Sequence, residues 1–214
     1  MGVSVLVLGE SGSGKSTSLR NFEPGEIGIF NVAGKPLPFR KKLPKADHPD
    51  YLAIKASLAK NTLNAYVIDD SQYLMAFQSF AKANEKGYGK FTDIAVSFEQ
   101  LLEAANQTSS DTIVYFLHHT EMREDGRIKA KTIGKMLDNQ LTIEGLFPIV
   151  IMSVCDEEGY KFVTTSDGTN PCKAPMDMLP PIMDNDLKAV DTAIRDYWDL
   201  DPLGGVSNAD KPSQ

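Results

Sequence analysis

The chain has 214 residues, of which 42% are hydrophobic and 24% are charged, which is the make-up of one globular domain rather than of a disordered chain. No stretch approaches the roughly 18 uninterrupted apolar residues of a membrane span, and the amino terminus lacks the basic region of a secretory signal. Its two cysteines, Cys155 and Cys172, are too few for a disulfide framework. We therefore expect a cytoplasmic protein without membrane contact.

The net charge of −7 is concentrated near the carboxyl end, where residues 177–214 contain eight aspartates and three cations. Evenly spread negative charge would argue against nucleic-acid binding, whereas this distribution leaves the rest of the chain nearly neutral. Two basic clusters lie in that part. Residues 35–45 hold five cations with no acid between them, and residues 127–135 hold four.

Residues 3–8 are almost continuously apolar, which predicts a strand buried on both faces, as in a parallel sheet. Further strands are predicted over residues 27–32, 65–68 and 112–117. Prolines predict a loop over residues 34–49. Helices are expected over residues 51–63 and 73–86. A third helix, capped by Thr92, is indicated by apolar residues that recur on one face: Ile94, Phe98, Leu101, Leu102 and Ala105.

The fourth strand is expected to end at His118 and His119, before a polar loop that runs through Gly126. Residues 147–154 and 160–164 predict an antiparallel hairpin at the later edge of the sheet. Asp184 is the expected cap of a last helix, whose buried face would carry Leu187, Val190, Ile194 and Tyr197. We expect one α/β domain over residues 1–200, with helices flanking a mostly parallel sheet, and a flexible tail over residues 201–214.

Directly after the first strand, residues 9–17 satisfy the G-x-x-x-x-G-K-[ST] pattern of the phosphate-binding P-loop. Its glycines let several N–H groups converge on an anion, and a helix starting near Gly14 would add the positive end of its dipole. Lys15 is expected to bridge the β- and γ-phosphates as a catalytic group, and Ser16 to ligate Mg²⁺. The predicted nucleotide-binding residues are Glu10, Ser11, Gly12, Ser13, Gly14, Lys15, Ser16 and Thr17.

A site for a magnesium–nucleotide complex also needs an acid at the end of a neighbouring strand. Asp69 and Asp70 follow the third predicted strand. We predict that Asp69 holds Mg²⁺, directly or through water, and that Asp70 is the base for the attacking water. Two aspartates here could instead merely begin the next helix, whose dipole favours negative charge. Asp70 is shorter than the glutamate of many ATPases, which predicts slow hydrolysis or a base elsewhere, with Glu10 as a substitute.

The two adjacent histidines lie where the carboxyl ends of parallel strands open into a ligand crevice. Neighbouring residues of a strand point to opposite faces, so only one of the two can reach a nucleotide. We predict that His119, rather than His118, senses the γ-phosphate. The alternative is a hydrogen-bonded histidine pair without chemistry.

Beyond the phosphate loop, the chain resembles the phage-encoded P-loop ATP-binding proteins of the RecA-like/AAA group that act in DNA recombination by single-strand annealing. The similar segments are NVAGKPLPF (31–39), YVIDDSQYLM (66–75), YFLHHTE (115–121), KAKTIGKML (129–137) and DNDL (184–187). Together they span about residues 3–198. The resemblance implies a RecA-like core, ATP and Mg²⁺ binding, and a role in recombination or replication of phage DNA in the bacterial host cytoplasm.

The resemblance also implies a single-stranded DNA partner, and the two basic clusters are its candidate sites. In the first cluster Lys35, Arg40, Lys41 and Lys42 would track phosphates while Phe39 stacks on a base; a solvated, proline-stiffened loop is the alternative. In the second cluster Lys131 or Lys135, with Arg127 in reserve, would reach the γ-phosphate of a neighbouring subunit in a homo-oligomer; scattered surface lysines are the alternative. A single-strand binding protein is a further partner that would fit a role in DNA recombination.

Two other function classes stay open at this stage. A nucleotide-dependent interaction module would bind ATP as a switch with little turnover. A P-loop kinase for small molecules would close an arginine-bearing lid over the phosphates. The chain has five arginines and only two of them are close together, which disfavours the kinase.

Overall fold

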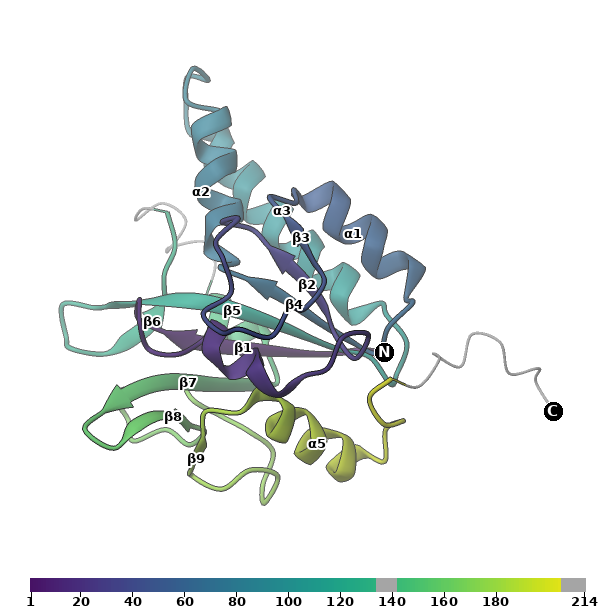
Figure 1. Ribbon diagram of the computed structural model, residues 1–214. Coiled ribbons are helices and arrows are strands. Elements are labelled where there is room, and N and C mark those ends of the chain that lie inside the picture. The colour runs from purple at the N-terminus through teal and green to yellow at the C-terminus, as the bar shows by residue number, and fades with distance from the viewer. Residues whose placement is uncertain (134–141, 205–214) are drawn as a thin grey trace.

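The computed structural model describes residues 1–133 and 142–204, and at its centre lies a nine-stranded sheet (Figure 1). The strands are β1 (Val3–Gly9), β2 (Gly28–Asn31), β3 (Lys45–Asp47), β4 (Ala65–Asp69), β5 (Ile113–Met122), β6 (Ile128–Ala130), β7 (Ile149–Asp156), β8 (Gly159–Val163) and β9 (Ile182–Asp184). Their order is β3-β2-β4-β5-β1-β7-β8-β9, with β6 paired to β5.

The six strands from β3 to β7 in this order pair in parallel, and β8 and β9 continue the sheet antiparallel at the later edge. β5 lies between β1, which leads into the phosphate loop, and β4, which ends in the predicted acid pair. The predicted α/β class, with a mostly parallel sheet and an antiparallel hairpin at its later edge, is confirmed.

Helices cover both faces of the sheet, and the alternation of side chains along β1 shows why. The helices are α1 (Tyr51–Lys60), α2 (Gln72–Ala81), α3 (Gly89–Asn106) and α5 (Leu187–Trp198), with short 3₁₀ helices η1 (Ser16–Asn21) and η2 (Ile143–Leu146). Leu6 and Leu8 pack with α1, α2 and α3 on one face, whereas Val5 and Val7 pack with η1 and α5 on the other (Figure 1). Because residues 5–8 of β1 are all apolar, this part of the strand is buried on both sides. None of the helices in the described ranges is long and apolar enough to cross a membrane.

Among the predicted boundaries that differ from the structure, three differ because pairing or capping departs from the local pattern. The expected loop over residues 34–49 contains β3, which pairs in parallel with β2. α3 starts at Gly89 with Tyr88 as its N-cap, so Thr92 lies inside the helix. α5 is capped by Asp186, whose carboxylate accepts hydrogen bonds from the N–H groups of Lys188 and Ala189, because Asp184 ends β9.

The end of α5 and the start of the predicted tail also differ from expectation. Tyr197 is 44% exposed, and the buried face of the helix carries Asp191 and Arg195 instead. Trp198 packs against the apolar cluster on this face. Residues 201–203 contact the body: the Nδ2 group of Asn64 donates to the carbonyl of residue 202 at 2.6 Å, and Leu203 joins the same apolar cluster.

β5 is longer than predicted, so that the two histidines lie inside it and not at its end. The strand continues to Met122 because β6 pairs with it antiparallel, Thr120 opposite Ala130 and Met122 opposite Ile128. The predicted polar loop is therefore the turn of a hairpin.

Candidate functional site

The phosphate loop folds back over the end of β1, and two glycines allow it. Gly12 and Gly14 have φ values of 82° and 96°, in the left-handed region that favours glycine. A Cβ atom on Gly14 would also lie 2.7 Å from the ring of Tyr160 on β8. The N–H groups of Gly12, Gly14 and Lys15 donate to no acceptor within the described residues. The loop therefore presents free backbone donors, which is the arrangement that binds an anion.

The predicted helix at the end of this loop is shorter than expected. η1 is a six-residue 3₁₀ helix that starts at Ser16, with Lys15 as its N-cap residue. An anion would therefore be held by the loop amides and by the Lys15 ammonium group, with the amino end of this short helix beside them.

Lys15 is buried beneath the loop. Its Nζ atom donates to the carbonyl oxygens of Gly9 at 2.7 Å and of Glu10 at 2.8 Å. Burial lowers the pKa of Lys15 from 10.5 to about 8, against the opposing attraction of Asp70 and Asp69. An ammonium group has three donors, so one remains for a phosphate oxygen. A bound phosphate would also relieve the cost of burying this charge.

Ser16 and Asp69, the two residues predicted to hold Mg²⁺, are in direct contact. The Ser16 hydroxyl lies 2.9 Å and 3.0 Å from the two carboxylate oxygens of Asp69. Burial raises the pKa of Asp69 to about 6, with a further contribution from the neighbouring charge of Asp70. Hydroxyl and carboxylate oxygens suit Mg²⁺, which keeps most of its ligands as water and phosphate oxygens. No cluster of three or more His, Cys, Asp or Glu residues in the described ranges could hold a metal, so the fit depends on those additional ligands.

Asp70 has both carboxylate oxygens occupied. Oδ1 lies 3.2 Å from Nε2 of His119, and Oδ2 lies 2.8 Å from Nζ of Lys35. Burial alone would raise the pKa of Asp70, but the hydrogen bonds from His119 and Lys35 outweigh it and hold the pKa at about 2. The residue has a φ of 60°, a strained backbone conformation for a side chain of this kind. The predicted base is therefore ionised and already paired.

The two histidines separate as the alternation of a strand requires. The side chain of His119 faces Asp70. Its backbone N–H donates a hydrogen bond to Oε1 of Gln72 at 3.2 Å. His118 is fully buried on the other face, with Nε2 2.8 Å from the carbonyl of Lys131 and Nδ1 2.9 Å from the hydroxyl of Ser71. Burial lowers the pKa of His118 to about 4, so it is a neutral structural residue.

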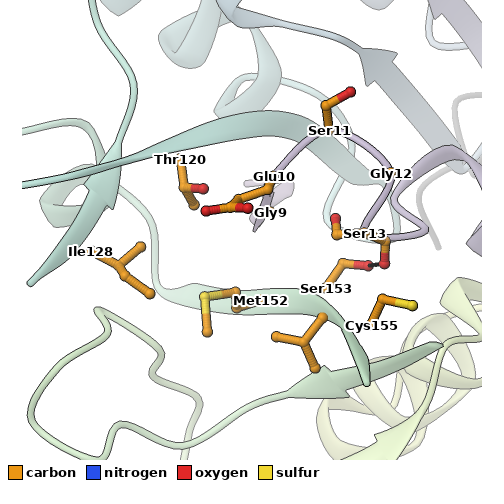
Figure 2. A pocket seen from close by; sticks show the side chains of 11 residues that line it. Gly9, Glu10, Ser11, Gly12, Ser13, Thr120, Ile128, Met152, Ser153 and Cys155 are labelled. Carbon is orange, nitrogen blue, oxygen red and sulfur yellow. Dashed lines mark hydrogen bonds between the residues drawn. The ribbon is translucent and has the colours of Figure 1, made fainter. Parts of the chain in front are cut away.

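These side chains share one cavity of about 290 Å³. It is lined by nine predicted site residues: Ser11, Gly12, Gly14, Lys15, Ser16, Thr17, Asp69, Asp70 and His119. Glu10 and Ser13 instead line a neighbouring cavity of about 310 Å³ beside β7, where Figure 2 shows them with Thr120 and Met152. The side chain of Glu10 thus lies away from the acids, which argues against its predicted role as a substitute base.

Four lining residues were not predicted as part of the nucleotide site: Lys35, Pro36, Pro38 and Tyr160. The sequence predicts a DNA contact for Lys35. It does not predict the contact with Asp70, because the two residues are 35 positions apart in the chain. Tyr160 comes to the loop through the pairing of β8 with β7, in which it lies opposite Cys155. No local sequence signal marks either residue.

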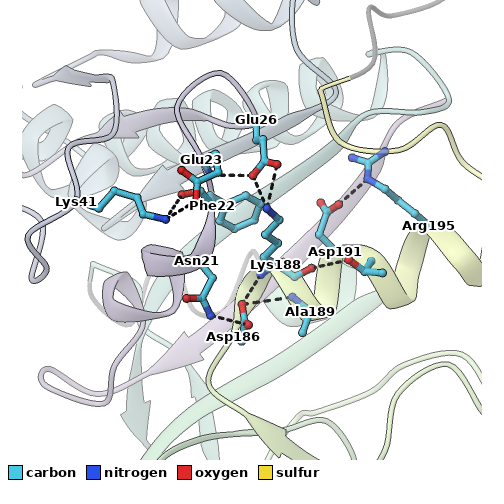
Figure 3. A network of polar contacts seen from close by, with 11 residues as sticks. Asn21, Phe22, Glu23, Glu26, Lys41, Asp186, Lys188, Ala189, Asp191 and Arg195 are labelled. Atoms are coloured by element: carbon cyan, nitrogen blue, oxygen red, sulfur yellow. Dashed lines mark hydrogen bonds and ion pairs between the residues drawn. The ribbon is translucent and has the colours of Figure 1, made fainter.

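The first basic cluster is mostly paired. Lys41 donates to Glu23 at 2.7 Å and to the carbonyl of Phe22 at 3.1 Å, beside the contacts that join η1 to α5 (Figure 3). Lys45 forms an ion pair with Asp47, and Phe39 packs against the apolar cluster beneath it. These contacts do not fit the prediction that Phe39 and Lys41 bind single-stranded DNA. Arg40 and Lys42 are exposed.

The second basic cluster also holds acidic partners. Lys129 pairs with Glu121 at 2.7 Å across the β5–β6 hairpin, and Arg127 lies 3.8 Å from Asp125. Lys131 is exposed, and it adjoins a small cavity of about 220 Å³ next to His119. Lys135 lies outside the described residues.

No protein-family model matches the chain, and no curated protein has a similar sequence. Among solved structures, it is similar to an ATPase from the type III secretion system of pathogenic bacteria, at 14% identity and a TM-score of 0.47. The similar region covers 74% of this chain and 53% of that ATPase, so the chain spans about half of its length. The fold class stands on the strand order and the phosphate loop of this chain.

Proposed function

We propose that the protein binds ATP with Mg²⁺ and hydrolyses it slowly. The observation that carries the proposal is one cavity in which free loop amides and the Lys15 ammonium group face the Ser16–Asp69 oxygen pair, with Asp70 and His119 on the same wall. The cations would bind the phosphates, and the oxygen pair would hold Mg²⁺, which withdraws charge from the phosphate oxygens. The choice of ATP over other nucleotides rests on the resemblance.

In the proposed hydrolysis, Asp70 accepts a proton from water as the water oxygen bonds to the γ-phosphorus. The bond from that phosphorus to the bridging oxygen of ADP breaks, and ADP leaves with the electron pair. His119, 3.2 Å from Oδ1, positions the carboxylate. Because a carboxylate with a pKa of about 2 is a weak base, turnover should be slow in the ligand-free arrangement of these groups.

The test is to measure MgATP binding by calorimetry and phosphate release by a colorimetric assay. We expect micromolar binding and phosphate release that Asp70→Asn lowers about 100-fold, within the range for removal of a general base, with ATP affinity largely kept. Absence of nucleotide binding in the wild type would refute the proposal. Binding without measurable phosphate release would instead support the interaction module, which the paired state of Asp70 favours. None of the five arginines lines the cavity, so phosphoryl transfer to a nucleoside is not expected.

A role in phage DNA recombination is the finer part of the proposal, and it rests on the resemblance. Arg40, Lys42 and Lys131 are the exposed cations of the two basic clusters that we propose for contact with single-stranded DNA, and Lys131 is the one for action in trans in an oligomer. Phosphate contacts make affinity fall steeply with salt. We expect single-stranded DNA binding at low salt that an Arg40→Ala/Lys42→Ala double variant weakens, with Lys60→Ala on α1 as the control. If DNA neither binds nor alters phosphate release, the recombination role is wrong and the ATPase proposal stands.

A further inference from the structure

Lys35 points into the nucleotide cavity, although it belongs to the basic cluster considered for DNA. Its ammonium group lies 2.8 Å from Oδ2 of Asp70 and 5.3 Å from the ring centroid of Tyr73. It lines the same cavity as Lys15, and its side chain is 59% exposed. The cavity therefore holds two cations, one fixed beneath the loop and one on a flexible, accessible stem.

The backbone of Lys35 is held in place. The Nδ2 group of Asn31, which is buried at the end of β2, donates to the carbonyl oxygen of Lys35 at 2.7 Å. Gly34 has a φ of 68°, and a Cβ atom there would lie 2.0 Å from the ring of His48. Only glycine fits this turn, and the turn fixes the position of the Lys35 backbone relative to the end of β2. The position of the ammonium group at the cavity is thus built by the fold, while the side-chain stem beyond it can swing.

The carboxylate of Asp70, which Lys35 contacts here, is a weaker partner for an ammonium group than the terminal phosphate of a bound triphosphate would be. A carboxylate carries one negative charge, whereas the terminal phosphate of a bound triphosphate carries about two and offers three acceptor oxygens. Attraction between charges at fixed distance grows with their product, and hydrogen bonds between two charged groups are the stronger ones. The γ-phosphate of a triphosphate in the cavity should therefore draw the ammonium group away from Asp70, while a diphosphate, which has no γ-phosphate, should not.

We propose that Lys35 is a second phosphate-binding residue, supplied by the same chain, that exchanges Asp70 for the terminal phosphate when a nucleoside triphosphate binds. The exchange frees Oδ2 of Asp70 only in the triphosphate-bound state, and His119 keeps its contact with Oδ1. Lys35 then makes the site able to distinguish triphosphate from diphosphate without a cation from a neighbouring subunit. The inference rests on the proposed function, because it needs a nucleotide in this cavity.

The experiment compares the dissociation constants of MgATP and MgADP for the wild type, Lys35→Ala, Lys35→Arg and Lys41→Ala. Lys41 is the matched control, because it lies in the same basic cluster but pairs with Glu23 outside the cavity. We expect Lys35→Ala to weaken ATP binding about tenfold or more, on the order of a charge-assisted contact, and ADP binding less than about twofold. Lys35→Arg should retain most of the preference for ATP, and Lys41→Ala should retain all of it.

A second readout does not depend on turnover. In the ligand-free wild type the carboxyl carbon of Asp70 should report the contact with Lys35, and Lys35→Ala should change its chemical shift, as measured by carbon NMR. Saturating MgATP should change the chemical shift of this carbon in the wild type, and MgADP should not.

The outcomes separate the two proposals. If the wild type binds ATP and Lys35→Ala weakens ATP and ADP equally, or weakens neither, the role of Lys35 is wrong and the nucleotide site stands. If no variant, including the wild type, binds either nucleotide, both proposals are overturned.

Discussion

The two ends of the parallel sheet each bury one cation, and they differ in how its hydrogen bonds are satisfied. At the amino ends of β4 and β5, Arg195 donates to Oδ1 of Asp191 at 2.5 Å and to the carbonyls of Asp111, Asp201 and Asn64 at 2.9, 2.6 and 2.6 Å. At the carboxyl ends, Lys15 donates to two carbonyls and keeps a donor free beside a cavity.

The comparison separates a structural charge from a functional one. The guanidinium group of Arg195 joins four segments of the chain, and the second oxygen of Asp191 accepts from the hydroxyl of Tyr115 at 2.8 Å. Around Lys15 one of the two acids is poorly compensated: burial raises the pKa of Asp69 to about 6, whereas Asp70 is paired with Lys35 and His119. Perturbed groups with unused donors beside a cavity are typical of binding sites. Burial of a charged group is therefore a weak indication of function, and an unused hydrogen-bond donor on that group is a stronger one.

The largest effect is expected at the structural cation. Arg195→Ala should lower the free energy of unfolding by about 3–5 kcal/mol, because it leaves the carboxylate of Asp191 buried without its partner. Urea denaturation would measure the loss, and the double variant Arg195→Ala/Asp191→Asn should recover part of it. A loss below about 1 kcal/mol would mean that the two buried cations do not differ as described.

The next effect is expected at the functional cation. Lys15→Ala should weaken MgATP binding by about 3 kcal/mol, the order of a lost hydrogen bond between charged groups, or roughly 100-fold. Stability without nucleotide should not fall, because burial already lowers the pKa of Lys15 to about 8 and so disfavours its charged form. Calorimetry gives the affinity and urea denaturation gives the stability. ATP affinity equal to that of the wild type would contradict the assignment.

Replacing the metal-binding acid should separate stability from binding. Asp69 has a folded pKa of about 6, above its ordinary value of 3.8, so its contribution to stability is present below pH 3.8 and is lost as the pH rises through 6. Asp69→Asn should therefore raise the free energy of unfolding at pH 7.5 by about 3 kcal/mol, the order of a two-unit shift. It should also weaken the dependence of nucleotide binding on Mg²⁺. Urea denaturation between pH 4 and pH 8, with and without Mg²⁺, tests both parts; a variant less stable than the wild type at pH 7.5 contradicts the first.

The smallest effect is expected for an exposed cation that serves as reference for the other two. Lys41→Ala removes the pair with Glu23, whose side chains are both substantially exposed, and should change the free energy of unfolding by less than about 1 kcal/mol. Nucleotide affinity should stay unchanged. A larger loss of stability would show that the contacts between η1 and its surroundings depend on this lysine.

The parts of the site that follow one another in the chain could be predicted from the sequence. The phosphate loop and the acid pair each sit directly after an apolar run, so their place at the carboxyl end of a strand follows from local pattern. His119 could be separated from His118 because a strand alternates its faces. The parallel sheet is indicated by apolar runs without polar alternation and by the helices predicted between them.

The remaining parts depend on pairing between distant segments. Lys35 reaches Asp70 because β2 lies beside β4 and Asn31 fixes the turn after it. The three-residue strand β9 carries no pattern of its own, so Asp184 was expected to cap α5 in place of Asp186. Arg195 and Asp191 read as polar residues of a surface helix, and only the packing of α5 on the sheet shows that they are buried.

The contact between Gly14 and Tyr160 imposes two separate restrictions on one residue. A larger side chain at residue 14 would collide with the ring, and it would also have to adopt a φ of 96°. Shortening Tyr160 removes the collision and leaves the backbone cost, so a compensating change on β8 cannot by itself admit alanine at residue 14. Substitutions at Tyr160 can therefore change the side chain that borders the phosphate loop, but they leave the requirement for glycine at residue 14 in place.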